Sequence, residues 1–164
     1  MKPKPIKPKK GQESVWDYPR PPALEFFNKT IKIYFNGKQV VQTNKAYRVL
    51  ETSHPPVYYI PLQDVEQQFL VDSDSSTHCE WKGKGSYFSL KVGEKFVKDA
   101  AWYYDTPKER FEPIKNYLAF YAHKVDKCTI DEEIVIPQPG NFYGGWVTKD
   151  IVGPFKGIEG SWGW

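Results

Sequence analysis

The sequence predicts a mainly β protein, and three observations support this. It contains 6 Trp, 11 Tyr and 10 Phe in 164 residues, and aromatic and β-branched side chains favour pleated sheets. Its 14 Pro and 12 Gly leave little room for long helices. Several segments alternate between apolar and polar residues, which is typical of strands with one buried face. We therefore expect a single antiparallel domain at residues 14–164 with one or two short helices.

The first residues differ in composition from the rest. Residues 1–13 are expected to be a flexible tail, because five lysines and no acid lie among the first ten. Of the 23 basic residues, 18 remain outside these lysines against 20 acidic ones. That balance argues against a nucleic-acid-binding surface. Ser14–Pro22 (SVWDYPRPP) follows, and its prolines predict an extended strap across the domain.

A hairpin is the clearest local prediction. Apolar and polar residues alternate from Ile31 to Phe35, Asn36-Gly37 supplies the positive φ pair of a type I′ turn, and Lys38–Gln42 returns. Residues 62–70 can form about two helical turns. Further strands are expected at residues 46–51, 57–60, 87–92, 118–122 and 128–136.

The second half is less regular. We expect a polar loop at Ser73–Thr77 and the start of a strand at Cys79–Lys82. Thr106–Glu109 has the pattern of a capping box with Pro at the first helical position, and Pro113 limits that helix to a turn or two. The glycine-rich last thirty residues carry many rings, which are expected to pack back on the sheet.

Polar, proton-active residues gather within Arg48–Val65 (RVLETSHPPVYYIPLQDV), where one strand ends and the next begins. Glu51 follows apolar neighbours, and desolvation of its charge would suit a general acid or base; hydrogen bonding at the strand end explains it equally well. Ser53 and His54 suggest a nucleophile with its base. Adjacent residues on an extended backbone point apart, however, and no Gly-x-Ser-x-Gly elbow is present. His54 holding the Pro-Pro bend is the simpler interpretation.

Cys79 is a second candidate, with Lys82 able to favour its thiolate. On a regular strand the two side chains would point apart, so their cooperation requires a twist, a bulge or a strand end, which Gly83 could mark. An inert buried thiol is the alternative for Cys79, and Cys128 is expected in the core. Two cysteines without a disulfide framework indicate a reducing, cytoplasmic location.

The remaining candidates would bind rather than react. Trp102 and Tyr104 can form the floor of a pocket, although core packing explains them too, and Lys156 can meet an anion. The ligand-binding candidates are Arg48, Ser53, His54, Trp81, Trp102, Tyr104 and Lys156. We expect no metal and no cofactor, because the cysteines and histidines lack a ligand spacing and the glycines match no phosphate-binding motif.

Several phrases together resemble a known family. They are SVWDYPRPP, RVLETSHPPVYYIPLQDV, CEWKG, AAWYYDTP, LAFYAHKVD and PQPGNFYGGWVTKDIVGPFKG. In this order they resemble the bacterial domain-of-unknown-function family 427, which carries a nucleotidyltransferase-like label. The resemblance runs from about Ser14 to Trp164.

The resemblance implies a β-tent-like antiparallel fold without the zinc knuckles of related folds. It draws attention to motif positions, with Glu80 where a proline is more usual. These positions are Glu51, Cys79, Lys82, Gly83, Trp102 and Tyr104. The transferase-like label finds no support, because no Gly-Ser pair followed by two metal-binding aspartates is present.

Three functional hypotheses follow. The first is a pocket that binds a small polar or anionic molecule. In its extended form the pocket also catalyses a reaction, with Glu51, Cys79 and Lys82 as catalytic candidates. The second is a non-catalytic interaction module that presents the rings of the strap and the glycine-rich tail. The third is a homodimer sealed by that tail. A membrane span is not expected, because no stretch approaches roughly 18 apolar residues.

Overall fold

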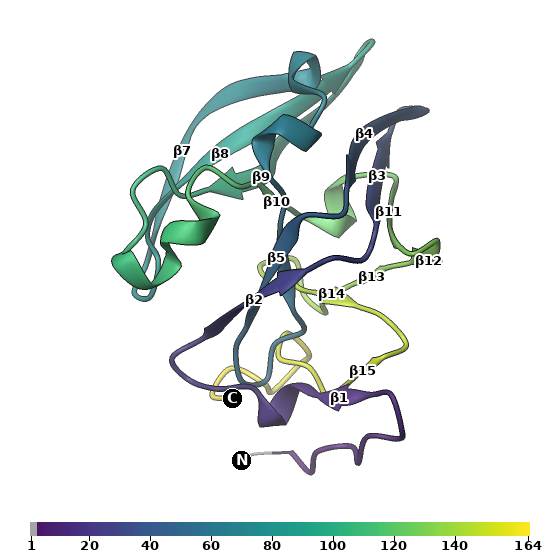
Figure 1. Cartoon of the computed structure of the whole chain (residues 1–164), viewed down its shortest axis with the longest axis vertical. Coiled ribbons are helices and arrows are strands. Elements are labelled where there is room, and N and C mark those ends of the chain that lie inside the picture. Colours follow the sequence, from purple (N-terminus) through teal and green to yellow (C-terminus); the bar gives the residue numbers. More distant parts are fainter. Residues whose placement is uncertain (1–2) are drawn as a thin grey trace.

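Antiparallel strands joined by turns and short 3₁₀ helices make up the protein (Figure 1). The structure is a computed structural model and describes residues 3–164. The strands are β1 (Glu13–Ser14), β2 (Ala23–Phe27), β3 (Ile31–Phe35), β4 (Lys38–Thr43), β5 (Ala46–Leu50), β6 (Val57–Tyr59), β7 (Leu70–Cys79), β8 (Gly83–Val92), β9 (Lys95–Tyr103), β10 (Ala119–Phe120), β11 (Lys127–Ile130), β12 (Glu133–Ile134), β13 (Ile136–Pro137), β14 (Trp146–Val147) and β15 (Ile151–Val152). The 3₁₀ helices are η1 (Val15–Asp17), η2 (Leu62–Asp64), η3 (Gln67–Phe69), η4 (Glu109–Ile114) and η5 (Ala122–Lys124). The mainly β prediction is confirmed.

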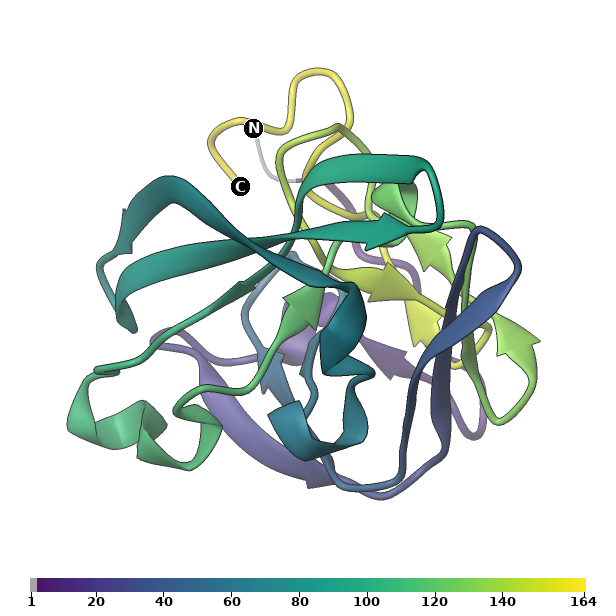
Figure 2. The same ribbon diagram turned by 90° about the horizontal axis from the view of Figure 1, so that it is seen from above.

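Three sheets form the framework. Their strand orders are β10-β9-β8-β7, β12-β11-β3-β4 and β2-β5-β6, and their neighbours pair antiparallel. Figure 1 shows the first sheet on one side of the molecule and β3, β4 and β11 on the other, with β2 and β5 between them. Seen from above, the long β7–β8–β9 ribbon lies across the other strands (Figure 2).

Backbone and side-chain contacts join the sheets. Ile60 and Leu118 exchange two hydrogen bonds of 2.8 Å, which tie the end of β6 to the start of β10. The main core takes buried side chains from all three sheets, for example Ile31, Ala46 and Leu90. This shared core fixes where the loops at the strand ends meet.

The hairpin prediction at residues 31–42 is confirmed. Ile31, Ile33 and Phe35 are buried while the residues between them are half-exposed. Asn36 and Gly37 have φ values of 47° and 77°, as a type I′ turn requires. The helical turns expected at residues 62–70 are η2 and η3.

Two predictions around β7 are wrong. Ser73–Thr77 is not a loop but part of β7, the edge strand of its sheet. Its polar residues suit this position, since the register shifts between Asp72 and Ser76 and two serine hydroxyls donate to the Asp99 carboxylate. Cys79–Lys82 likewise does not begin a strand: Cys79 ends β7, and β8 starts at Gly83.

The capping-box prediction is also wrong. The residue that precedes η4 is Lys108, which makes no side-chain capping bond. Thr106 instead donates its hydroxyl to Asp105 at 3.3 Å. Pro113 lies within the short helix, whose backbone is kinked at Phe111.

The two terminal segments lie together. β1 pairs parallel with β15, Trp16 Nε1 donates to the Pro154 carbonyl at 2.9 Å, and Ile6 N donates to the Gly153 carbonyl at 2.9 Å. The division into a tail at residues 1–13 and a domain from residue 14 stays a prediction. No helix in residues 3–164 is long and apolar enough to cross a membrane.

Candidate functional site

A cavity of about 550 Å³ opens where three loop regions meet. These are the β7–β8 turn, the segment between β5 and β6, and the chain around residues 138–156. It brings together most of the side chains that the sequence singled out. These are Glu51, His54, Cys79, Trp81, Lys82, Trp102, Tyr104 and Lys156. Their shared place is an observation, whereas their roles stay predictions.

The geometry of the β7–β8 turn explains why Cys79 and Lys82 both line one cavity. Cys79 pairs with Gly83 at the end of the ladder, and Gly83 has a φ of 105°, a conformation that favours glycine. The residues between them leave the regular strand, so their side chains no longer alternate strictly. Cys79 is half-buried, in contact with a second apolar cluster that contains Tyr59 and Trp102.

Lys82 is buried, with 8% of its surface exposed. Its Nζ lies 5.9 Å from the Tyr104 ring centroid and 5.7 Å from that of Phe111, within the range of cation–π attraction. Among residues 3–164 its ammonium group has no hydrogen-bond acceptor and no ion-pair partner. Buried lysines are almost always paired, so this one is an exception.

The ammonium groups of the other two lysines that line the cavity already donate hydrogen bonds to backbone oxygens. Lys124 Nζ donates to the carbonyls of Lys98 and Asp99 at 3.2 and 3.0 Å. Lys156 Nζ donates to a backbone oxygen of Trp164 at 3.2 Å. Lys82 is therefore the lysine best placed to take up a partner from solvent.

Aromatic rings form the floor. Trp102 Nε1 donates to the Tyr59 hydroxyl at 3.3 Å, and the Trp102 and Tyr121 ring centroids are 4.6 Å apart. Burial raises the pKa of Tyr59 and of Tyr104 well above the ordinary value, so both hydroxyls stay neutral. Trp102 and Tyr104 thus belong to a packed cluster and also line the cavity.

Glu51 and His54 lie on one tight turn, in which His54 N donates to the Glu51 carbonyl at 3.0 Å. The Glu51 Oε2 atom lies 4.0 Å from His54 Nε2 and 4.0 Å from Arg20 Nε. These separations exceed hydrogen-bond length, so the carboxylate faces two donors without bonding directly to either.

His54 is held as a neutral ring. Burial, together with the charges of Lys156, Arg20 and Lys82, lowers its pKa to about 4, against a hydrogen bond from Gln138 that raises it. Three cations thus act on this end of the cavity. The ring also lies edge-on to Tyr143 at 5.0 Å.

Gln138 is the residue that the sequence missed. It is 2% exposed, lines the cavity and bonds to the His54 ring at 3.0 Å. It lies between Pro137 and Pro139, where the sequence has no alternation of apolar and polar residues from which burial of a side chain could be predicted. Only its tertiary contacts reveal it.

Ser53 does not line the cavity. It is fully buried with a φ of 72°, and its hydroxyl has no partner among the described residues. Its carbonyl accepts from Lys156 N at 2.9 Å, which ties the turn to the C-terminal segment. The His54 ring bonds to Gln138 and not to Ser53, so the geometry gives no support to a Ser-His pair.

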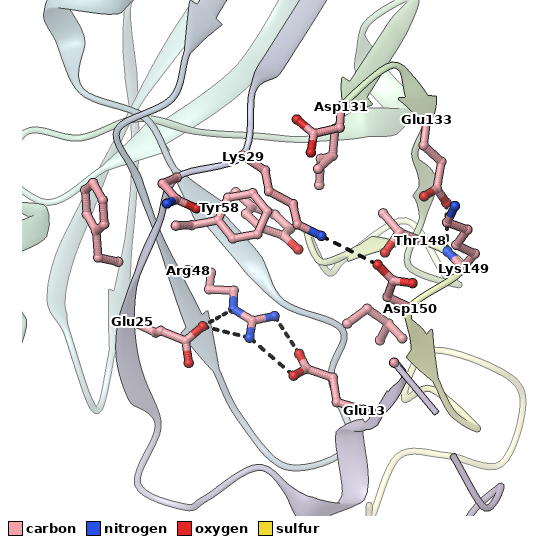
Figure 3. A pocket seen from close by; sticks show the side chains of 16 residues that line it. Glu13, Glu25, Lys29, Arg48, Tyr58, Asp131, Glu133, Thr148, Lys149 and Asp150 are labelled. Carbon is pink, nitrogen blue, oxygen red and sulfur yellow. Dashed lines mark hydrogen bonds and ion pairs between the residues drawn. The ribbon is translucent and has the colours of Figure 1, made fainter. Parts of the chain in front are cut away.

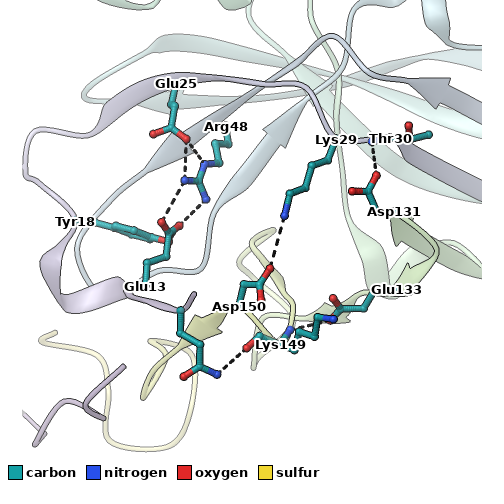
Figure 4. Close-up of polar contacts among 11 residues, drawn as sticks. Glu13, Tyr18, Glu25, Lys29, Thr30, Arg48, Asp131, Glu133, Lys149 and Asp150 are labelled. Atoms are coloured by element: carbon teal, nitrogen blue, oxygen red, sulfur yellow. Dashed lines mark hydrogen bonds and ion pairs between the residues drawn. The ribbon is translucent and has the colours of Figure 1, made fainter. Parts of the chain in front are cut away.

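Arg48 lies at a different place, in a second cavity of about 440 Å³. Its guanidinium bridges Glu13 and Glu25, with contacts of 2.5 and 2.7 Å (Figure 3). Burial alone would raise the Glu13 pKa, but hydrogen bonds from Arg48 and Tyr18 lower it below the ordinary value. Figure 4 shows this network beside the Lys29–Asp150 pair. Arg48 on β5 thus links β1 and β2 through its ion pairs with Glu13 and Glu25.

The rings of the interaction-module hypothesis do not form one exposed patch. Trp146 is 1% exposed and donates Nε1 to the Phe120 carbonyl at 3.0 Å. Trp16 packs against Trp164 with centroids 5.6 Å apart. Exposure of Trp16, Trp146 or Trp162 in one patch would favour this hypothesis, and of these three only Trp162 is largely exposed, at 82%.

The described residues hold no group of three or more His, Cys, Asp or Glu side chains arranged for a metal ion. A family described as Domain of unknown function (DUF427), labelled NTP_transf_9, matches residues 23–131. No curated protein matches the chain.

Proposed function

Because the chain belongs to the DUF427 family, whose description names no activity, we propose a function from the cavity: it binds a small anionic molecule that Lys82 anchors. The observation that carries this proposal is the buried side chain of Lys82, which lines the cavity and whose ammonium group has no hydrogen-bond or ion-pair partner among the described residues. An anion entering the cavity would pair with this charge at a place already shielded from part of the solvent, where ion pairs are stronger than in bulk water.

The surroundings of Lys82 favour the same ligand. Lys156 and Arg20 add positive charge near His54, where their fields help to lower the histidine pKa. The rings of Trp81, Trp102 and Tyr121 line the cavity and offer flat apolar surface. A ligand with a ring and an anionic group suits this combination.

Catalysis is a further part of the hypothesis. Glu51 is the candidate acid or base, and Cys79 is the candidate nucleophile. Both residues line the same cavity as Lys82. Neither cysteine is in a disulfide among residues 3–164, which supports the proposal of a reducing, cytoplasmic compartment.

A non-catalytic interaction surface is the second candidate, and one observation favours it. Phe142 and Trp162 are 75% and 82% exposed and line one shallow hollow of about 230 Å³. Exposed large rings are enriched at binding sites. This surface adjoins the cavity, because Phe142 and Tyr143 line both.

A thermal-shift screen of nucleotides, sugar phosphates and aromatic carboxylates tests the anion site. We expect at least one compound to raise the melting temperature of the parent and of Lys84→Met, but not of Lys82→Met. Lys84 is a matched control, because it is exposed on β8 and does not line the cavity. Equal binding by parent and Lys82→Met, or no response to any anion, would contradict the proposal.

A further inference from the structure

Gln138 uses its whole amide group in hydrogen bonds. Its Oε1 accepts from Gly145 N at 3.0 Å, and its Nε2 donates to the Lys156 carbonyl at 2.9 Å. The same Nε2 lies 3.0 Å from His54 Nδ1. Buried amides require such complete satisfaction, so the side chain is fixed on three sides.

These partners determine the orientation of the amide. A backbone N–H can only donate, so the atom facing Gly145 is the oxygen. A backbone carbonyl can only accept, so the atom facing Lys156 is the NH₂ group. His54 Nδ1 therefore faces a donor and must accept. A neutral imidazole that accepts at Nδ1 carries its proton at Nε2.

Glu51 and His54 both line the cavity. Glu51 Oε2 lies 4.0 Å from His54 Nε2, and an oxygen atom can sit about 2.8 Å from both. Such an atom would accept from His54 and donate to Glu51. A water molecule or a ligand hydroxyl that replaces it does both, whereas a carboxylate or an ionised phosphate oxygen cannot donate.

We propose that Gln138 is a positioning residue that fixes His54 as the Nε2–H tautomer, and that the ligand of the cavity carries a hydroxyl group beside its anionic group. The second half rests on the proposed function. Lys82 binds the anion, while His54 and Glu51 together bind the hydroxyl. The ligand class is thus a hydroxylated anion with a ring, such as an aromatic hydroxy acid. The low pKa of His54 is consistent with a neutral ring over the physiological range.

Long-range ¹H–¹⁵N NMR of the unliganded protein tests the positioning role without any ligand. We expect His54 to show protonation at Nε2 in the parent. In Gln138→Glu the carboxylate cannot donate to Nδ1 and instead accepts a hydrogen bond from it, so the signal should change to protonated Nδ1. The Met side chain in Gln138→Met has no donor for His54 Nδ1, so this variant should give a mixture of tautomers. It replaces Gln138→Glu in the test if the buried carboxylate prevents folding.

Parent His54 protonated at Nδ1, or an unchanged Nε2–H signal in both variants, would overturn the positioning role. His54→Gln identifies the His54 signal among the three histidines.

A pair of probes tests the ligand class. 3-Phenyllactate and 3-phenylpropionate differ only by one hydroxyl, and titration calorimetry should show about tenfold tighter binding of the first. The preference should become smaller in Gln138→Met, because only part of the His54 population would then carry its proton at Nε2. Equal affinities in the parent would overturn the hydroxyl assignment. If neither probe binds, the ligand assignment fails together with the anion site, and the histidine spectra alone decide the role of Gln138.

Discussion

Cys79 and Gly83 lie opposite each other in the last residue pair of the β7–β8 ladder, and Gly83 has a φ of 105°. This pair closes the turn that carries Lys82 into the cavity. The turn is held from outside as well, because Lys108 N donates to the Lys82 carbonyl at 3.1 Å. The geometry of one glycine therefore supports the placement of both candidate side chains.

Gly83→Ala should destabilise the protein by about 1–2 kcal/mol, because residues with a Cβ atom rarely adopt this backbone conformation. Chemical denaturation measures the change. Gly163→Ala is the matched control, since a Cβ atom there meets nothing within 4 Å and no positive φ applies. Equal stabilities of the two variants would contradict the argument from backbone strain.

Lys82→Met should change the free energy of unfolding of the unliganded protein by less than about 1 kcal/mol, because it removes an ammonium group without an ion-pair partner and keeps the apolar stem. Denaturation curves of parent and variant decide this. A clear loss of stability would show that Lys82 already has a favourable partner in the folded protein.

The His54 ring makes stability depend on pH. Its pKa is about 4 in the folded protein, against the ordinary value of 6.5, so the unfolded chain binds a proton first as the pH falls. Stability is fully present above pH 6.5 and is lost towards pH 4, by roughly 3 kcal/mol at most. Unfolding curves at pH 6.5, 5.5 and 4.5 measure the loss.

His54→Gln should remove most of this pH dependence, and His78→Gln, on the exposed part of β7, should leave it. Charged groups that face His54 are Glu51, Arg20, Lys82 and Lys156. A pH dependence identical in parent and His54→Gln would contradict the assignment.

Arg48→Met should cost about 2 kcal/mol, because it leaves Glu13 and Glu25 facing each other without their cation. Lys95→Met is the control. It breaks the exposed pair with Asp126, for which a loss of about 0–1 kcal/mol is usual. Anion binding at Lys82 should stay unchanged in Arg48→Met, and a weakened anion site would show that the two cavities are coupled.

Native alkylation with iodoacetamide should modify Cys79 and leave Cys128 intact. Cys79 is half-buried in the cavity wall, while Cys128 is 2% exposed and burial raises its thiol pKa. Mass spectrometry counts the adducts, and Cys79→Ser should give none. Modification of Cys128 at a similar rate would indicate that the core opens easily.

Local chemistry predicts the elements whose causes are local. Asn36-Gly37 specifies its turn whatever surrounds it, and the alternation of Ile31–Phe35 marks a strand with one buried face. Ser73–Thr77 is a wrong prediction, because a run of polar residues is typical of a loop as well as of an edge strand. On an edge strand such residues are compatible with pairing, since one side faces solvent.

The candidate site is predictable in part. Glu51, Cys79 and Lys82 are evident in the sequence because their residue types are chemically active and stand beside turns. Gln138 is not, because an amide becomes important only through its partners, and those lie far away in sequence. Arg48 lies on the other face of its strand from Val49, in the second cavity with Glu13 and Glu25, and its role as a ligand-binding residue stays a prediction.

The cavity has walls of two kinds. Glu51, Cys79 and Lys82 lie inside the region matched to the family, at residues 23–131, whereas Gln138, Tyr143 and Lys156 follow it. The second wall consists of loops anchored by short bridges such as β1–β15. Loops tolerate exchange better than sheets do. On the proposed function, residues 138–156 are therefore the segment in which substitutions should alter ligand selectivity and leave the sheets intact.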